Sequence, residues 1–203
     1  SEDNIMPLGA FKAALMGTAG VSTGDVVLLS SQTASSSTVL DFTGLNSTYG
    51  EYIFKFYNIN PETDGAELQF TMGTPTIGDG NIVMTTTAFV AYHSEDAAQA
   101  ALTYTPSIDL AQSDSYQELT HNIGNGADEC AAGELHIFNP ASTTYVKHFY
   151  GRSSNYDEGN TTAGRAWDHF AAGYGNRAAA VTGVRFNMST GDWDGTIKMW
   201  GVK

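Results

Sequence analysis

The chain has 203 residues, of which 41% are hydrophobic and 11% aromatic. That composition supports one globular domain with a sizeable core and excludes a disordered chain. Lys and Arg number 9 against 22 Asp and Glu, a formal net charge of -13, which disfavours nucleic acid and anionic membranes as partners. The single cysteine, Cys130, excludes an internal disulfide and a cysteine-based zinc site.

The acidic start of the chain lacks the basic residues of a secretory signal. No apolar run reaches the roughly 18 residues of a membrane span. We therefore expect a product of the cytoplasm, or a particle that assembles there, with no membrane insertion.

The first 24 residues differ from the rest. Leu8, Phe11 and Leu15 fall at helical spacing, and Gly17 is a stop signal. Three turns are too few for a stable isolated helix. We predict that residues 1–24 form an N-terminal arm or short helix, which either packs on its own domain or docks on a neighbouring subunit through Leu8, Phe11 and Leu15.

Residues 25–203 are predicted to form a single β-sandwich domain. Tyr52, Phe54 and Phe56 share one face of a predicted strand, with the residues between them on the other face. In the next predicted strand Ala66, Leu68, Phe70 and Met72 alternate with polar residues, as in a strand with one buried face. Further strands are expected at 26–31, 38–42, 86–92, 133–138, 145–150, 181–188 and 195–202. Nine or ten short strands predict an all-β fold, an antiparallel β-sandwich that is jelly-roll-like.

The segments between these strands are unequal in composition. Residues 73–81 are rich in turn formers. The Ala-rich stretch 96–102 is predicted to form one or two helical turns. Residues 121–133 and 151–164 are polar and contain several glycines, which predicts exposed loops.

The sequence motifs that would indicate catalysis or metal binding are few and incomplete. Residues 20–24 match the G-x-S-x-G pattern of a catalytic serine. In a nucleophile elbow a strand precedes this pattern and a helix follows it, whereas here a possible helix precedes it and a predicted strand follows. The five histidines lack the close spacing of a metal site, although His136 and His148 fall on neighbouring predicted strands. The acidic turns at 157–160 and 192–195 are read as solvated, with calcium left open. We assign no catalytic, cofactor-binding or metal-ligating residues.

Aromatic residues gather in the turn-rich C-terminal third. Tyr156, Trp167, Tyr174 and Trp193 are candidates for contact with a glycan or a partner. Exposed rings pack on sugar faces, and the same residue types are enriched in subunit interfaces. Packing in a core or interface and contact with a glycan both remain open.

Several segments resemble a family of structural proteins of marine tailed phages. One is Glu51 to Ile59, followed by Pro61 and Asp64; others are 86–93, 109–112 and 136–149. The ending, from Val184 through Gly191 to 195–202, is similar to the C-terminal strands of many small proteins encoded among phage virion genes. The resemblance covers residues 37–202.

The resemblance implies a virion protein that assembles with other virion proteins and with its own copies in the host cytoplasm. We expect a non-enzymatic subunit on the particle exterior, of tail-fibre, baseplate or spike type, that contacts host surface glycans through its loops. The alternatives are a capsid decoration protein bound to the major capsid lattice and a free carbohydrate-binding lectin. No cofactor is expected, and strong negative charge discourages sticking to packaged DNA.

Overall fold

The computed structural model describes residues 25–73, 82–157 and 163–203. These residues form two antiparallel β-sheets and contain no helix, so the predicted all-β antiparallel sandwich is confirmed. The proposed arm residues Leu8, Phe11 and Leu15 lie outside the described residues. No described helix is long and apolar enough to cross a membrane.

The larger sheet has nine strands. Their order is β1 (Val26–Ser37), β13 (Trp193–Val202), β3 (Glu51–Pro61), β9 (Ala131–Phe138), β10 (Lys147–Asp157), β11 (Arg165–Gly175), β5 (Met84–Ser94) and β6 (Ala100–Tyr104), with β7 (Ala111–Ser113) also paired to β5. The smaller sheet has the order β2 (Val39–Thr43), β12 (Gly183–Met188), β4 (Leu68–Gly73) and β8 (Gln117–Glu118).

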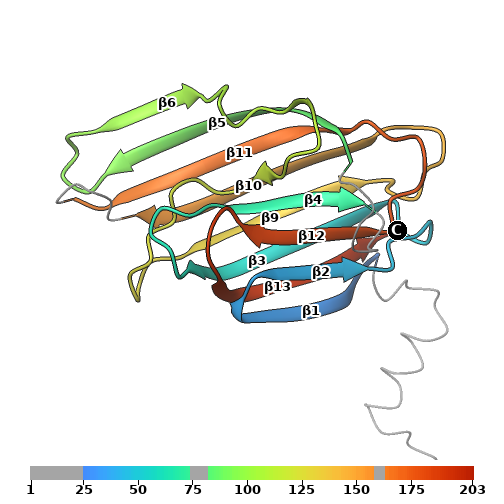
Figure 1. The fold of residues 1–203 in the computed structure, drawn as a ribbon, viewed down its shortest axis with the longest axis horizontal. Coiled ribbons are helices and arrows are strands. Elements are labelled where there is room, and N and C mark those ends of the chain that lie inside the picture. Colours follow the sequence, from blue (N-terminus) through green and yellow to red (C-terminus); the bar gives the residue numbers. More distant parts are fainter. Residues whose placement is uncertain (1–24, 74–81, 158–162) are drawn as a thin grey trace, which may run out of the picture.

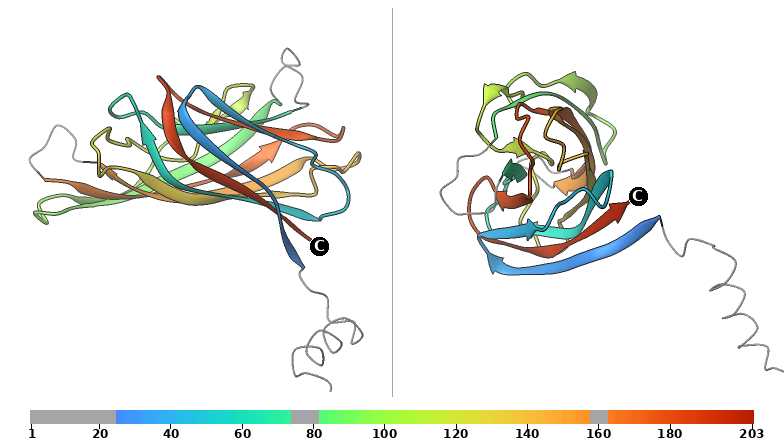
Figure 2. Two further views of the ribbon diagram at one scale, coloured as in Figure 1. Left: turned by 90° about the horizontal axis from the view of Figure 1, so that it is seen from below. Right: turned by 90° about the vertical axis from the view of Figure 1, so that its right-hand side faces the viewer.

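The larger sheet curves around the smaller one, which lies against its concave face (Figures 1 and 2). From β1 to β5 the chain alternates between the two sheets, and this alternation makes the sandwich jelly-roll-like. By contrast, β9, β10 and β11 follow one another within the larger sheet, as a meander.

The core lies between the sheets because strand pleating sends alternate side chains to opposite faces. Tyr52, Phe54 and Phe56 of β3 are fully buried, as their alternation predicts. Phe42 of β2 and Phe186 of β12 meet Phe54 from the opposite sheet, with ring centroids 5.5 and 5.4 Å from it. This aromatic cluster is free of polar side chains and holds the two sheets together.

Two predictions about connecting segments were wrong. The Ala-rich stretch 96–102 is not helical: residues 100–102 belong to β6, which pairs with β5. The segment 151–164, expected as an exposed loop, contains most of β10, and the next strand, β11, was missed entirely. The buried positions of β10 in this segment are themselves glycine or polar residues, so no apolar alternation marks the strand. Pairing on both sides satisfies its backbone.

Candidate functional site

The four aromatic residues proposed for glycan or partner contact do not form one surface. Trp193 begins β13 and is 0% exposed, and Trp167 of β11 is 6% exposed. Their burial favours the packing alternative over contact with a glycan. Trp193 packs in the core between the two sheets, and Trp167 packs against Tyr92 and His121.

The other two aromatic residues are partly exposed but far apart along the sheet. Tyr156 is paired with Ala166 near one end of the β10–β11 ladder, while Tyr174 is paired with His148 near the other. Both lie on the outer face of the larger sheet. They cannot act with Trp167 and Trp193 in one glycan site.

A different set of aromatic side chains lies together on the outer face. We call it the aromatic band, and it crosses β5, β11, β10 and β9: Phe89, Phe170, Tyr150, His136 and Phe138. The rings of Phe89 and Phe170 stack with centroids 5.0 Å apart, and those of His136 and Tyr150 with centroids 4.5 Å apart. Phe89 is 41% exposed and Tyr150 is 36% exposed. Ring packing thus continues across four strands at the surface.

Charged side chains run beside the aromatic band in alternating sign. Arg152 of β10 donates two hydrogen bonds to Asp168 of β11, at 2.9 and 2.6 Å. Lys55 of β3 lies 3.5 Å from Glu134 of β9. A shallow depression of about 530 Å³ is lined by these four residues among others. On this face Lys55, Arg152 and Lys198 accompany the carboxylates of Glu51, Glu134 and Asp168. Asp109 adjoins the band as well, because it accepts a hydrogen bond from Tyr104, the cross-strand partner of Phe89.

His136 is the one histidine in the aromatic band. Its Nδ1 lies 2.5 Å from a carboxylate oxygen of Glu51 on the neighbouring strand β3. His148, the other histidine predicted to lie close to it, is instead near Tyr174, with ring centroids 6.1 Å apart. Burial raises the pKa of the Tyr150 hydroxyl, and the carboxylates of Glu51 and Glu134 raise it further.

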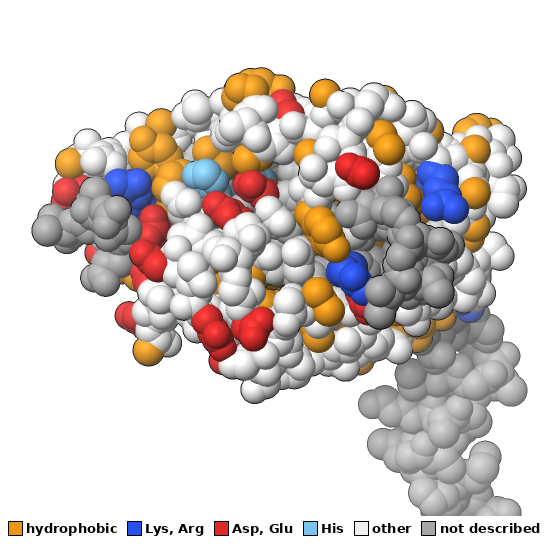
Figure 3. All heavy atoms as spheres, in the orientation of Figure 1, with side chains coloured by type: hydrophobic (Ala, Val, Ile, Leu, Met, Phe, Trp, Pro, Cys, Tyr) orange, Lys and Arg blue, Asp and Glu red, His pale blue; other side chains and the backbone are white. Residues whose placement is uncertain are grey.

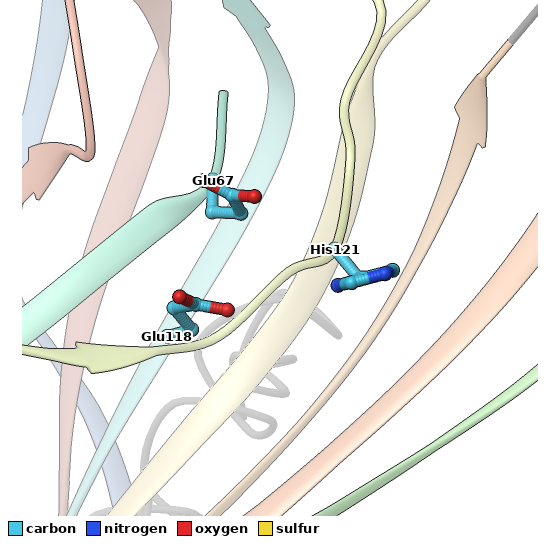
Figure 4. A group of neighbouring side chains, drawn as sticks. All are labelled: Glu67, Glu118 and His121. Carbon is cyan, nitrogen blue, oxygen red and sulfur yellow. The ribbon is translucent and has the colours of Figure 1, made fainter. Parts of the chain in front are cut away.

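A second cluster lies at the edge of the smaller sheet. Glu67 immediately precedes β4, Glu118 ends β8, and His121 follows three residues later. One ligand atom from each of these side chains lies within 4.8 Å of the other two, and all three residues are partly buried. Figure 4 shows the three side chains around a common space. On the face that carries the smaller sheet, acidic side chains and a histidine adjoin at the surface (Figure 3).

Hydrogen bonds of the β4–β8 ladder bring these residues together. Gln69 pairs with Glu118, and Ala66 forms a bridge with Ile123. The Leu119 amide also donates to the Leu68 carbonyl oxygen. The segments containing Glu67 and residues 118–121 therefore run side by side despite their separation in sequence.

Burial shifts the pKa values of side chains in and near this cluster. Burial raises the pKa of the Glu118 carboxyl to about 7, and the neighbouring Glu67 carboxylate adds to this rise. Burial lowers the pKa of His121, against the opposite influence of Glu67 and Asp157. Deeper still, His169 of β11 is 0% exposed, and burial with the nearby His121 lowers its pKa to about 4.

Sequence reasoning missed this cluster. Glu67 and Glu118 were not singled out as a pair, and His121 was considered only among the five histidines and at the start of a predicted loop. The residue types were visible, but the pairing of β4 with the two-residue strand β8 was not. No spacing rule joins residues on separate segments of a sheet.

No protein-family model matches the chain, and no curated protein matches it significantly.

Proposed function

We propose that this chain is a non-enzymatic structural protein on the exterior of a bacteriophage particle, of tail-fibre, baseplate or spike type, and that its copies associate through the outer face of the larger sheet. The observation that carries the assembly role is the aromatic band. Contiguous exposed apolar surface is typical of protein interfaces. The virion role rests on the sequence resemblance.

Charge favours association through this face. The chain carries a net charge of -13, so most approaches between two copies are repelled. Around the aromatic band, however, the cations Lys55, Arg152 and Lys198 lie among the carboxylates and offset much of their charge. Acidic and basic side chains also alternate across neighbouring strands, in the order Asp168, Arg152, Glu134 and Lys55. A second copy that is rotated relative to the first can therefore place unlike charges opposite each other.

Ring orientation favours a protein partner over a sugar. The planes of His136 and Tyr150 differ by 13°, and those of Phe89 and Phe170 by 22°. Rings this close and this parallel cover each other's faces. They present edges to the solvent, whereas a sugar packs on an open ring face. Contact with host glycans is therefore the weaker part of the expected function.

Self-association is tested by sedimentation of the full chain. We expect a mass that is a multiple of the 21.6 kDa protomer, and a shift to the monomer in Phe89→Lys. Tyr145, 71% exposed and outside the aromatic band, provides the control Tyr145→Lys, which adds the same charge and should leave the mass unchanged. A monomeric wild type, or equal loss in both variants, would overturn association through this face.

The virion role is tested separately, by cryo-electron microscopy of the intact particle. Density on the tail supports the fibre, baseplate or spike assignment, and density on the head at a fixed number of copies supports a capsid decoration protein instead. Absence from the particle contradicts both. Glycan binding by a chain that is absent from the particle would establish the lectin alternative.

A further inference from the structure

The cluster of Glu67, Glu118 and His121 has the donor set of a cation site. Two carboxylates and one imidazole come from two neighbouring segments and share a space in which their ligand atoms lie within 4.8 Å of one another. Three atoms this close to one another always leave a point that is within about 2.8 Å of all three, where a cation could lie. Movement of under about 1 Å per side chain would reach the 2.0–2.2 Å bonds of zinc.

The second observation concerns buried histidine nitrogen atoms at and near the cluster that lack hydrogen-bond partners. Within the residues that the structure describes, the buried Nδ1 of His121 has no hydrogen-bond partner. His169 is 0% exposed, and neither of its ring nitrogens has a partner in the same part of the chain. Buried polar atoms are seldom left unpaired. An imidazole with an unpaired ring nitrogen therefore belongs to the cluster, and a second buried imidazole, that of His169, lies near it.

The cluster also holds its ligands in place. The Ser189 hydroxyl donates to a carboxylate oxygen of Glu67 at 2.6 Å. The His121 ring packs edge-on against Trp167, with centroids 4.7 Å apart. The carbonyl oxygen of His121 accepts a hydrogen bond from the Asn155 side chain of β10 at 2.8 Å. Outer contacts of this kind orient metal ligands.

We propose that Glu67, Glu118 and His121 bind a divalent transition-metal cation of the Zn²⁺ class, which links the edge of the smaller sheet to the larger sheet. An imidazole with two carboxylates suits zinc, whereas calcium and magnesium prefer oxygen ligands alone. Three protein ligands leave a fourth position for water. The link runs from β4 and β8 through His121 and its contact with Trp167 of β11. This site is independent of the proposed virion role.

Calorimetric titration of the full chain with ZnCl2, together with its thermal unfolding, tests the site. We expect one strong site per chain, and a melting temperature that rises with zinc because the cation binds only the folded state. Glu118→Gln should weaken binding at least about 100-fold, since loss of an outer partner alone costs about 10- to 100-fold. Ser189→Ala removes such an outer partner and should weaken binding about 10-fold.

Matched controls separate this site from general attraction to an acidic surface. Glu95 and His93 are exposed and lie outside the cluster, so Glu95→Gln and His93→Ala should bind zinc as the wild type does. His121→Ala should lose the strong site. Glu118→Gln removes a repelled carboxylate without changing its shape, so the variant should fold. Zinc binding that is absent from the wild type, or equal in Glu118→Gln and Glu95→Gln, would overturn the proposal.

Discussion

The concave face of the larger sheet is filled in two different ways. Beneath β2 and β12 it packs only apolar side chains, and Phe54, Phe42 and Phe186 meet edge to face. Beneath and beyond the short strand β8, the same face presents Ser153, His169 and Asn155, which are all nearly or fully buried. One pleated sheet thus supports a dry core at one side and a polar interior at the other.

The difference follows from what covers each part. The strands β2, β12 and β4 of the smaller sheet have five or six residues each and turn buried apolar side chains toward the larger sheet, but the edge strand β8 has only two residues. Past that edge, an irregular segment covers β10 and β11, and its backbone groups require partners. Ser153 donates to the Leu119 carbonyl oxygen, and Asn155 donates to those of His121 and Asn122. A polar interior is therefore the consequence of covering a sheet with a loop.

The largest effect is expected in the dry core. Phe54→Ala leaves a cavity between the two sheets and should lower the free energy of unfolding by about 3–5 kcal/mol. Chemical denaturation monitored by tryptophan fluorescence measures it. Ile53, the neighbouring residue on the outer face, supplies the control Ile53→Ala, which should cost much less. Equal losses would mean that the apolar cluster does not dominate stability.

The next effect concerns pH and the polar interior. The folded-state pKa of His169, about 4, lies below the ordinary value of 6.5 because burial disfavours the charged ring. The unfolded chain therefore binds the additional proton, and the stability contribution, complete above pH 6.5, is lost as pH falls toward 4. The full loss is about 3 kcal/mol. In His169→Phe this part of the acid sensitivity should disappear.

Denaturation of both proteins between pH 8 and pH 4 measures that difference. His93→Phe, at an exposed position, is the control and should keep the wild-type pH dependence. Because neither nitrogen of His169 has a partner among the residues that the structure describes, His169→Phe should also be no less stable than the wild type at pH 8. Parallel pH curves for His169→Phe and the wild type would contradict a neutral buried imidazole.

The smallest effect tests the hydrogen bonds between β10 and the covering segment. Ser153→Ala removes the donor to the Leu119 carbonyl oxygen, 2.6 Å away, and leaves that acceptor unpaired. A loss of about 1–2 kcal/mol in the free energy of unfolding is expected. Ser154→Ala, one residue along and exposed on the outer face, should be neutral. If both variants match the wild type, the polar interior contributes little to stability.

The sequence by itself determined the fold class and the dry core. Alternation in residues 52–56 and 66–72 depends only on the two-residue period of a strand, so it identifies buried faces without knowledge of the partner strands. It failed for β11, where Asp168, His169 and several small residues hide the period. Trp167 and Trp193 were likewise proposed for contact with a glycan or a partner although both are buried, because burial depends on what covers a strand.

Only the tertiary structure decided which residues share a surface. The aromatic band joins side chains of four strands, and the Glu67–Glu118–His121 cluster joins two segments that lie far apart in the chain. Strand register sets both, and register depends on long-range hydrogen bonds that no local pattern encodes. Local periodicity therefore specifies which face of a strand is buried, while pairing between distant strands creates the sites.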